Sequence, residues 1–382
     1  MRAAIQDLPA SRIREVANAG LGRSDVLAFW FGESDEVTPE PVREAAAESL
    51  RRGETFYSHN LGLPELREAI AADTSALHGP VGAGRIAVTS SGVSALMVAM
   101  QMLVGAGDEV VAVVPVWPNL TAQPAILGAR VTRVPLRPRA GAWGLDLQAL
   151  LAAVTPATRV LLVNAPNNPT GWTLTRAEQQ ALLQHCRRTG TWIVADEVYE
   201  RLWYGPGPAA PSFLDLAAPD DRLVVVHSFS KSFLMTGWRL GWMVLPVGAI
   251  DVAGKLLEFN SSCAPVFVQR GALAALAMAG DFVPGLVRRM RACRDRLHAG
   301  LAALPGVEVA VPDGGMYAFF RVAGQDDSLA FAKHLVRAHG LGLAPGVAFG
   351  PEAEGWLRWC FASRDPARLD DGLRRLAGAI GL

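Results

Sequence analysis

Lysine is scarce in this chain of 382 residues, although positive charge is not. Lysine and arginine together number 36, and only three of these are lysines, at positions 231, 255 and 333. Because arginine supplies positive charge elsewhere, a need for solubility does not explain why Lys231 is a lysine. A guanidinium stays protonated in proteins, whereas a lysine amine can lose its proton and attack a carbonyl. Lys231, in the turn "SFSKSF", is therefore a candidate nucleophile.

Cysteines and long apolar runs are also few. The four cysteines lie far apart and lack the spacing of a metal site, at Cys186, Cys263, Cys293 and Cys360. We expect them to be free thiols in a reducing compartment. No apolar stretch approaches the ~20 residues that a membrane helix needs, and the first 20 residues hold no signal-peptide core. These absences predict a cytoplasmic protein that does not bind membranes.

Charge and motifs exclude further classes of function. Acidic and basic residues both number 36, so the formal net charge is zero, which argues against nucleic acid as a partner. The sequence has no GxxxxGK[ST] motif, and no predicted strand is followed by GxGxxG, so a nucleotide-binding protein is not expected. The histidines, including His59 and His227, have no partner at ligand spacing, so no metal site is predicted.

Apolar strands alternate with amphipathic helices along the first two thirds of the chain. The strand-like runs are residues 85–90, 108–116, 157–166, 191–199 and 221–230. Helical segments such as residues 175–190, which end at Gly190, are expected between the last three strands. Strands that are apolar throughout and separated by helices predict an α/β fold, with a mostly parallel sheet flanked by helices.

The pattern changes after about residue 280. An arginine-rich helix is followed there by short strands around "MYAFFRV". We therefore assign residues 41–280 to a large ligand-binding domain. Residues 1–40 and 281–382, from both chain ends, are assigned to a smaller α+β domain.

Polar and aromatic residues follow the predicted strands where parallel sheets bind ligands, at their carboxyl ends. Taken singly, these residues are explained as turns, helix caps or core. Five strands deliver them to one edge of the sheet, and this convergence indicates a binding site. The residues are Ser90, Ser91, Gly92, Trp117, Asn164, Asn168, Asp196, Tyr199, Ser228, Ser230 and Lys231.

The chemistry of this set indicates its ligand. Ser91 and Gly92 open a helix, where free amides favour an anion such as phosphate, and Arg239 can add a charged fork to the same group. Asp196 suits a protonated ring nitrogen, and Trp117 offers a flat apolar face. Together with a reactive Lys231, these residues describe a pocket for pyridoxal phosphate.

Motifs along nearly the whole chain then point to a family. In order they are "FGESDEVTP", "YSHNLGLPELREAI", "NAPNNPTG", "DEVY", "SFSKSFLMTGWRLG", "DGGMYAFF", "PGVAFG" and "WLRW". The chain resembles a fold-type I, class I/II pyridoxal-phosphate aminotransferase of the aspartate aminotransferase-like family, and the lysine motif is the specific one. The resemblance implies transfer of an amino group from an amino acid to a 2-oxo acid, by a ping-pong cycle through a Lys231 aldimine.

The resemblance also implies roles for individual residues. Lys231 carries the cofactor, Asp196 keeps its pyridine nitrogen protonated, and Tyr199 and Asn168 bond its ring oxygen, which lowers the aldimine pKa. Trp117 stacks on the ring. The implied phosphate contacts are Ser91, Gly92, Val93, Ser228, Arg239 and, from a neighbouring subunit, Tyr57, so a homodimer is expected. The implied substrate contacts are Arg358, which clamps the carboxylate, with Gly32, Trp117 and Asn168.

Two alternatives use the same family scaffold. A pyridoxal-phosphate C–S lyase, which expels a leaving group by β-elimination, would have identical cofactor residues. A regulator that only senses the cofactor would need a DNA-binding winged helix, and residues 1–40 are too short to hold one.

Several residues depart from the family pattern or keep two interpretations. Ser34 and Glu36 stand where the family has a proline and an aromatic residue, so the amino donor is not predicted. We interpret Trp359 and Cys360 as packing behind the site. Trp30 and Phe31 are expected either to line the substrate pocket or to be buried between domains, and Arg12 and Arg14 to face solvent.

Overall fold

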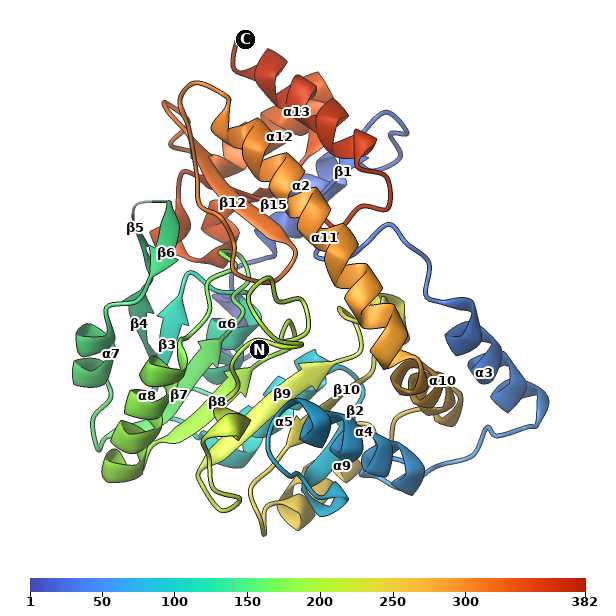
Figure 1. Cartoon of the computed structure of the whole chain (residues 1–382). Coiled ribbons are helices and arrows are strands. Elements are labelled where there is room, and N and C mark those ends of the chain that lie inside the picture. The colour runs from blue at the N-terminus through green and yellow to red at the C-terminus, as the bar shows by residue number, and fades with distance from the viewer. Residues whose placement is uncertain (140) are drawn as a thin grey trace.

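The computed structural model describes residues 1–139 and 141–382 and contains a central sheet of seven strands (Figure 1). The strand order is β2-β10-β9-β8-β7-β3-β4. β10 is antiparallel to both neighbours, and the other neighbouring pairs are parallel. The strands are β2 (Ile86–Thr89), β3 (Glu109–Val114), β4 (Arg130–Pro135), β7 (Thr158–Asn164), β8 (Trp192–Asp196), β9 (Leu223–Ser228) and β10 (Gly241–Val244). The predicted mostly parallel sheet is confirmed.

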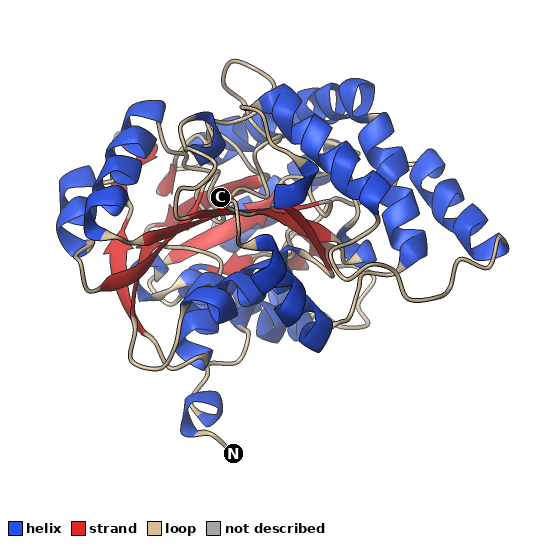
Figure 2. Ribbon diagram, turned by 90° about the horizontal axis from the view of Figure 1, so that it is seen from below, coloured by secondary structure: helices blue, strands red, loops and turns tan. Residues whose placement is uncertain are grey.

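Helices cover both faces of this sheet (Figure 2). In β3, Val110 and Ala112 pack into one apolar core, and Val111 and Val113 pack into another on the opposite face. This explains why β3 is apolar on both faces from Val110 to Val114. The first core also takes side chains from α5 (Gly92–Leu103), α6 (Asn119–Ile126) and α9 (Ile250–Asn260). The second takes side chains from α4 (Pro64–Leu77), α7 (Leu147–Ala153) and α8 (Arg176–Thr189).

One of the two helical connections expected between the last three strands is present. Thr175 caps α8 and forms a capping box with Glu178, and Gly190 ends the helix at φ 75°. The helix expected between β8 and β9 is absent, so that prediction is wrong. Residues 197–222 hold only a 3-10 turn, η2 (Phe213–Asp215). Prolines and glycines in "YGPGPAAP" explain the difference, since proline inside a helix removes a hydrogen bond and clashes with the preceding turn.

A second, four-stranded sheet lies with the C-terminal helices (Figure 1). Its antiparallel strands, in the order β11-β12-β15-β14, are β11 (Val307–Val309), β12 (Tyr317–Val322), β15 (Trp356–Cys360) and β14 (Ala344–Pro345). The helices beside it are α11 (Ala279–Ala302), α12 (Ser328–His339) and α13 (Ala367–Ala379). The arginine-rich helix and the strand at "MYAFFRV" are thus both present.

The N-terminal segment packs into this C-terminal unit. α2 (Arg12–Ala19) contacts α12 and β14, and β1 (Leu27–Ala28) pairs in parallel with β13 (Leu341–Gly342). Trp30 is buried between Gly20 and Gly342, where an added Cβ would stand 2.9 Å and 2.2 Å from its ring atoms. Both ends of the chain therefore share one apolar core.

The remaining elements complete the described chain. They are α1 (Ala3–Gln6), α3 (Glu40–Arg51), α10 (Val266–Ala277), the hairpin strands β5 (Arg137–Arg139) and β6 (Ala142–Gly144), and the 3-10 turns η1 (Ala83–Arg85), η3 (Thr236–Trp238), η4 (Gly346–Phe349) and η5 (Pro351–Ala353). Within residues 1–139 and 141–382, no single helix has the length and apolarity to cross a membrane. α10 and α11 meet that test only as a pair, which is bent by 79°.

Candidate functional site

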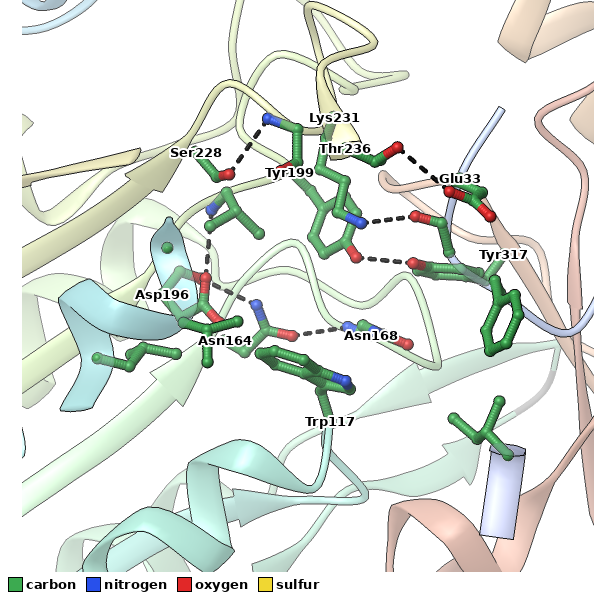
Figure 3. A pocket seen from close by; sticks show the side chains of 18 of the residues that line it. Glu33, Trp117, Asn164, Asn168, Asp196, Tyr199, Ser228, Lys231, Thr236 and Tyr317 are labelled. Atoms are coloured by element: carbon green, nitrogen blue, oxygen red, sulfur yellow. Dashed lines mark hydrogen bonds between the residues drawn. The ribbon is translucent and has the colours of Figure 1, made fainter. Parts of the chain in front are cut away.

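A cavity of about 390 Å³ opens where the carboxyl ends of the large sheet face the small sheet (Figure 3). It brings together most of the residues predicted from the sequence. Its lining is Ile13, Arg14, Phe31, Gly32, Glu33, Gly92, Val93, Leu96, Trp117, Asn164, Asn168, Asp196, Val198, Tyr199, Ser228, Ser230, Lys231, Thr236, Arg239, Tyr317 and Arg358. Three predicted residues, Ser90, Ser91 and Tyr57, are not part of this lining.

Lys231 stands in the turn after β9 and points into the cavity (Figure 3). Its Nζ donates a hydrogen bond of 2.6 Å to the main-chain oxygen of Gly32. Burial lowers the pKa of Lys231 to about 8, and the positive charge of Arg358 acts in the same direction. A larger fraction of the amine is therefore neutral near pH 7 than in an ordinary lysine, as a nucleophile requires.

Asp196 ends β8 and is a buried carboxylate without a cationic partner. It is 3% exposed, and no ion pair in the described part of the chain includes it. Its Oδ1 accepts a hydrogen bond of 3.4 Å from the amide of Val198. Burial raises the pKa of Asp196 to about 7. A buried acid of this kind fits a ligand that brings its own positive charge, such as a protonated ring nitrogen.

The start of α5 forms a cradle for an anion. Ser91 caps the helix at φ 136°, and its side chain accepts from the amide of Ser94, 3.1 Å away. The amides of a first helical turn have no intrahelical partner and attract anions. A Cβ added to Gly241, the first residue of β10, would stand 2.5 Å from the amide nitrogen of Gly92. Only glycine at this position therefore allows β10 to lie so close to the start of α5.

Two further side chains complete the cradle. Ser228, at the end of β9, lies beside Gly92. A Cβ added to Gly92 would stand 3.2 Å from the Cβ of Ser228. Arg239 is exposed, and its backbone has a positive φ of 55°. Its Nη1 donates a hydrogen bond of 2.7 Å to the Thr236 main-chain oxygen. Its other donors remain for a ligand in the cavity that it lines. The amides, the hydroxyl and the guanidinium together fit a phosphate group.

Arg358, in the middle of β15, is a buried cation on the opposite wall. It is 2% exposed, and the rings of Tyr317 and Phe349 lie 4.4 Å and 4.9 Å from its guanidinium carbon. It donates to Asn168 Oδ1 at 2.9 Å and to the Trp30 main-chain oxygen at 2.5 Å. Its Nε has no hydrogen-bond partner among the described residues. A buried guanidinium with an unused donor fits a substrate carboxylate.

Two tyrosines meet inside the cavity (Figure 3). The hydroxyl of Tyr199, after β8, lies 2.7 Å from the hydroxyl of Tyr317, in β12 of the small sheet. Burial raises the pKa of Tyr199 well above its ordinary value and the pKa of Tyr317 to about 12, so both hydroxyls are neutral at pH 7. Tyr317 was not assigned a role from the sequence, because no spacing connects position 317 with position 199.

The mouth of the cavity contains Glu33 and Ile13, which the sequence did not single out, together with Phe31 and Arg14, which it did. Glu33 accepts a hydrogen bond of 3.2 Å from the Thr236 hydroxyl, and Ile13 supplies an apolar wall. Phe31 is 36% exposed and lines the cavity, with the guanidinium carbon of Arg14 at 5.8 Å from its ring. Arg14 is thus exposed as predicted, but it also borders the site.

The other ambiguous residues lie outside the cavity. Trp30 is buried between the chain ends, and Arg12 is exposed and pairs with Glu15 at 2.8 Å. Glu36 pairs with Arg289 at 2.9 Å, and Ser34 accepts from the Glu36 amide.

The two residues after Arg358 both pack behind the site. Trp359 is fully buried against the ring of Phe29, with a centroid distance of 5.1 Å. Cys360 donates to the Glu33 main-chain oxygen at 3.4 Å. Neither residue lines the cavity.

A buried cluster of charges lies outside the cavity lining. His227, Glu197 and Glu200 place possible metal-ligand atoms within 4.8 Å of one another, although their spacing in the sequence gave no sign of this. The carboxylate of Glu200 already pairs with His78 Nε2 at 2.9 Å, and His78 Nδ1 pairs with Asp215 at 2.8 Å. Glu197 accepts hydrogen bonds from the Ser212 hydroxyl and the Phe213 amide. Because Glu197 and Glu200 already have partners, the absence of a metal site stays a prediction.

A family model, curated relatives and solved structures all match this chain to aminotransferases. The family described as aminotransferase class I and II matches residues 25–376. The aspartate aminotransferase of Musicola paradisiaca is 35% identical over 87% of this chain and 83% of its own length. The arginine–pyruvate transaminase of Pseudomonas aeruginosa is 34% identical over 87% and 85%. The structure of aspartate aminotransferase from Thermus thermophilus with maleate superimposes with a TM-score of 0.91, at 30% identity over 99% of each chain.

Proposed function

The chain belongs to the class I and II aminotransferases, and from this premise we propose how its residues carry out the transfer. The substrates are an α-amino acid and a 2-oxo acid, and pyridoxal phosphate is held at Lys231. One observation carries this proposal: a single cavity contains Lys231, the unpaired buried carboxylate of Asp196, and Arg358 with a free donor. Each of these groups meets a different part of the cofactor or substrate.

The residues around the cavity would hold the cofactor in one orientation. Its phosphate would lie at the start of α5 against Gly92, Val93, Ser91, Ser228 and Arg239. Its ring would lie against Trp117, with the ring nitrogen at Asp196 and the ring oxygen at Tyr199 and Asn168. When bound, this group supplies an aldehyde that takes up amino groups and a protonated ring that accepts electrons from the substrate Cα.

Lys231 would move the proton that the reaction requires. Its Nζ is neutral in a substantial fraction near pH 8, because burial lowers its pKa. A neutral amine can take the proton from the substrate Cα and later return it. Asp196 would keep the ring nitrogen of a bound cofactor protonated, since no ion pair among the described residues includes its buried carboxylate. Arg358 and the backbone of Gly32 orient the substrate carboxylate, so that the Cα proton faces Lys231.

The same site would serve both half-reactions. The amino acid and the 2-oxo acid share a carboxylate next to the reacting carbon, so Arg358 can bind each of them in turn. One site used twice gives ping-pong kinetics, in which the first product leaves before the second substrate binds. A C–S lyase would share the cofactor residues, but the relatives and structures compared above are transaminases.

We also propose that the active unit is a homodimer with Tyr57 shared between subunits. Tyr57 and Phe56 are 87% and 84% exposed, and Phe259 on α9 is 90% exposed. The amide of Ser58 donates to Cys263 Sγ at 3.3 Å, so the Tyr57 loop packs beside the end of α9. Large exposed aromatic residues of this kind are typical of an interface.

Mixed dimers test the crossing of Tyr57. A Lys231→Ala protein and a Tyr57→Ala protein are unfolded together and refolded as a mixture. If Tyr57 crosses, one site of each mixed dimer holds both native residues and activity rises above that of either variant. If Tyr57 serves its own subunit, no mixed site is native and activity does not recover.

The remaining predictions from the sequence are kept as proposals. We assign residues 41–280 to a cofactor-binding domain, with residues 1–40 and 281–382 as the smaller domain. The pairing of β1 with β13 supports placing both chain ends in one unit. We place the protein in the cytoplasm, and its four unpaired cysteines support a reducing compartment.

An absorbance experiment tests the proposed function. The purified protein is mixed with pyridoxal phosphate, and single amino acids are added without any 2-oxo acid. The panel contains aspartate and arginine, after the relatives, together with aromatic and aliphatic amino acids. We expect one donor to convert the lysine-bound band stoichiometrically to the aminated cofactor, and a 2-oxo acid to restore it. Catalytic release of ammonia with a persistent band would support a lyase, and absence of any lysine-bound band would contradict the cofactor assignment.

A further inference from the structure

Tyr317 contacts both walls of the cavity, and the proposed function gives it no role. Its hydroxyl lies 2.7 Å from the hydroxyl of Tyr199, which belongs to the wall that would hold the cofactor. Its ring lies 4.4 Å from the guanidinium carbon of Arg358. An added Cβ at Gly32 would stand 2.0 Å from its hydroxyl oxygen, so the glycine packs directly against that oxygen. Tyr317 therefore stands between the cofactor and substrate sides of the site.

The number of protons in the tyrosine pair limits what each hydroxyl can do. Each hydroxyl has one proton, and either oxygen can be the donor in their shared bond. Within the described residues, the Tyr317 hydroxyl has Tyr199 as its one hydrogen-bond partner. If Tyr199 gives its proton to a cofactor oxygen, the bond between the tyrosines persists only when Tyr317 is the donor. Both hydroxyls are buried, so breaking their bond would leave a polar group unsatisfied.

We propose that Tyr317 is a positioning residue, which donates its proton to Tyr199 and thereby directs the Tyr199 proton to the ring oxygen of the bound cofactor. This inference rests on the proposed function, because it requires a cofactor at Lys231. Successive O–H···O bonds polarise one another, so Tyr199 becomes a stronger donor. A stronger donor stabilises negative charge on the ring oxygen. It therefore lowers the pH at which the lysine-bound cofactor loses its proton.

The Tyr317→Phe variant tests the donor directly. It removes one oxygen and keeps the ring that packs on Arg358. The absorbance of the lysine-bound cofactor is titrated with pH, in the absence of substrate. We expect the midpoint to rise by about 0.5 pH unit, roughly threefold in proton affinity. Tyr199→Phe should shift the midpoint further in the same direction, and adding Tyr317→Phe to Tyr199→Phe should produce no additional shift.

Tyr204 provides a matched control. Its hydroxyl is also buried and donates a bond of 2.6 Å, but to the main-chain oxygen of Gly315 and not to Tyr199. Tyr204→Phe therefore removes a buried tyrosine hydroxyl that binds the chain two residues before Tyr317, without touching the proposed relay. We expect its midpoint to equal that of the native protein, and a shift as large as that of Tyr317→Phe would contradict the proposal.

A second modification reverses the expected sign and does not depend on the folding of Tyr317→Phe. Incorporation of 3-fluorotyrosine at position 317 keeps the hydroxyl and makes it a better donor, so the midpoint should fall below the native value. An unchanged midpoint in the fluorinated protein would overturn the inference. A native protein that forms no lysine-bound band at all would overturn the proposed function, and this inference with it, so the two failures are distinguishable.

Discussion

The guanidinium of Arg358, in the small sheet, donates a hydrogen bond of 2.9 Å to Oδ1 of Asn168, in the loop after β7 of the large sheet. This bond joins the residue that would bind the substrate carboxylate to the wall that would hold the cofactor. The acceptor is a neutral amide, so it orients the guanidinium without neutralising its charge. The full positive charge of Arg358 therefore remains for the substrate.

This relationship predicts the effect of placing a carboxylate at position 168. Asn168→Asp would supply an anion beside Arg358 that competes with the substrate carboxylate. We expect KM for the amino acid to rise about tenfold or more, because a close charged pair must be broken for binding. Steady-state kinetics with the best donor measure the change. Asn168→Ser, which adds no charge, is the control, and an equal rise in KM for both variants would contradict the explanation.

Replacement of Lys231 by arginine should show whether the site needs a positive charge at this position or an amine that can lose its proton. Lys231→Arg keeps the positive charge but removes an amine that can lose its proton. We expect no lysine-bound cofactor band and a loss of transamination of at least about 1000-fold, since no other group in the cavity can replace the amine. Lys255→Arg, on the exposed side of α9, is the matched control and should have native activity. Normal turnover by Lys231→Arg would refute the assignment.

The lowered pKa of Lys231 predicts how attachment of the cofactor depends on pH. Only the neutral amine attacks the aldehyde, and burial places the pKa of Lys231 at about 8. The rate of appearance of the lysine-bound band should rise about tenfold per pH unit below pH 8 and become constant above it. Stopped-flow absorbance of the cofactor-free protein between pH 6 and 10 provides the measurement. A rate that still rises tenfold from pH 9 to 10 would show an ordinary lysine.

The buried pair of His78 with Glu200 and Asp215 predicts a pH-dependent contribution to stability. Burial opposes protonation, but hydrogen bonds to Asp215 and Glu200 outweigh it and raise the pKa of His78 to about 10. A raised pKa means that the folded state holds the proton more tightly than the unfolded state. The stabilisation is therefore complete below pH 6.5 and is lost as pH rises towards 10.

The His78→Gln variant tests this sign. We expect it to lower the free energy of unfolding by about 3 kcal/mol near pH 6, because it breaks a buried charged pair. The loss should shrink to about 1 kcal/mol near pH 10, where His78 is neutral and contributes only ordinary hydrogen bonds. Urea unfolding at several pH values measures the difference. His334→Gln, at an exposed position, should show no such pH dependence, and a loss from His78→Gln that grows with pH would contradict the assigned charge.

The large sheet can be predicted from the sequence more readily than the rest of the fold. Runs such as "VLLV" (160–163) are apolar in every position because both faces of the sheet are covered, and that pattern is local. β10 follows the lysine turn without an intervening α-helix, and its antiparallel pairing depends on contacts with β2 and β9 that no local pattern encodes. Residues 197–222 were misjudged because a regular alternation was expected where prolines prevent a helix.

The candidate site was predictable where strand ends deliver residues to one edge. Asp196 ends β8 and Lys231 follows the adjacent strand β9, so parallel pairing of the two strands brings these residues together. Tyr317 and Glu33 reach the cavity from the small sheet and the N-terminal segment, and no spacing relates them to Lys231. The partnership of His78 with Glu200 is similarly invisible, since 122 positions separate the two residues.

The pairing of β1 with β13 constrains the order in which parts of the protein can fold during translation. Leu27 lies opposite Leu341, which emerges from the ribosome more than three hundred residues after it. The strands of the large sheet all lie within residues 86–244 and can assemble before that moment. Gly32 and Arg358 are likewise separated by most of the chain. The cavity wall that would bind the substrate therefore forms only after Arg358 has left the ribosome.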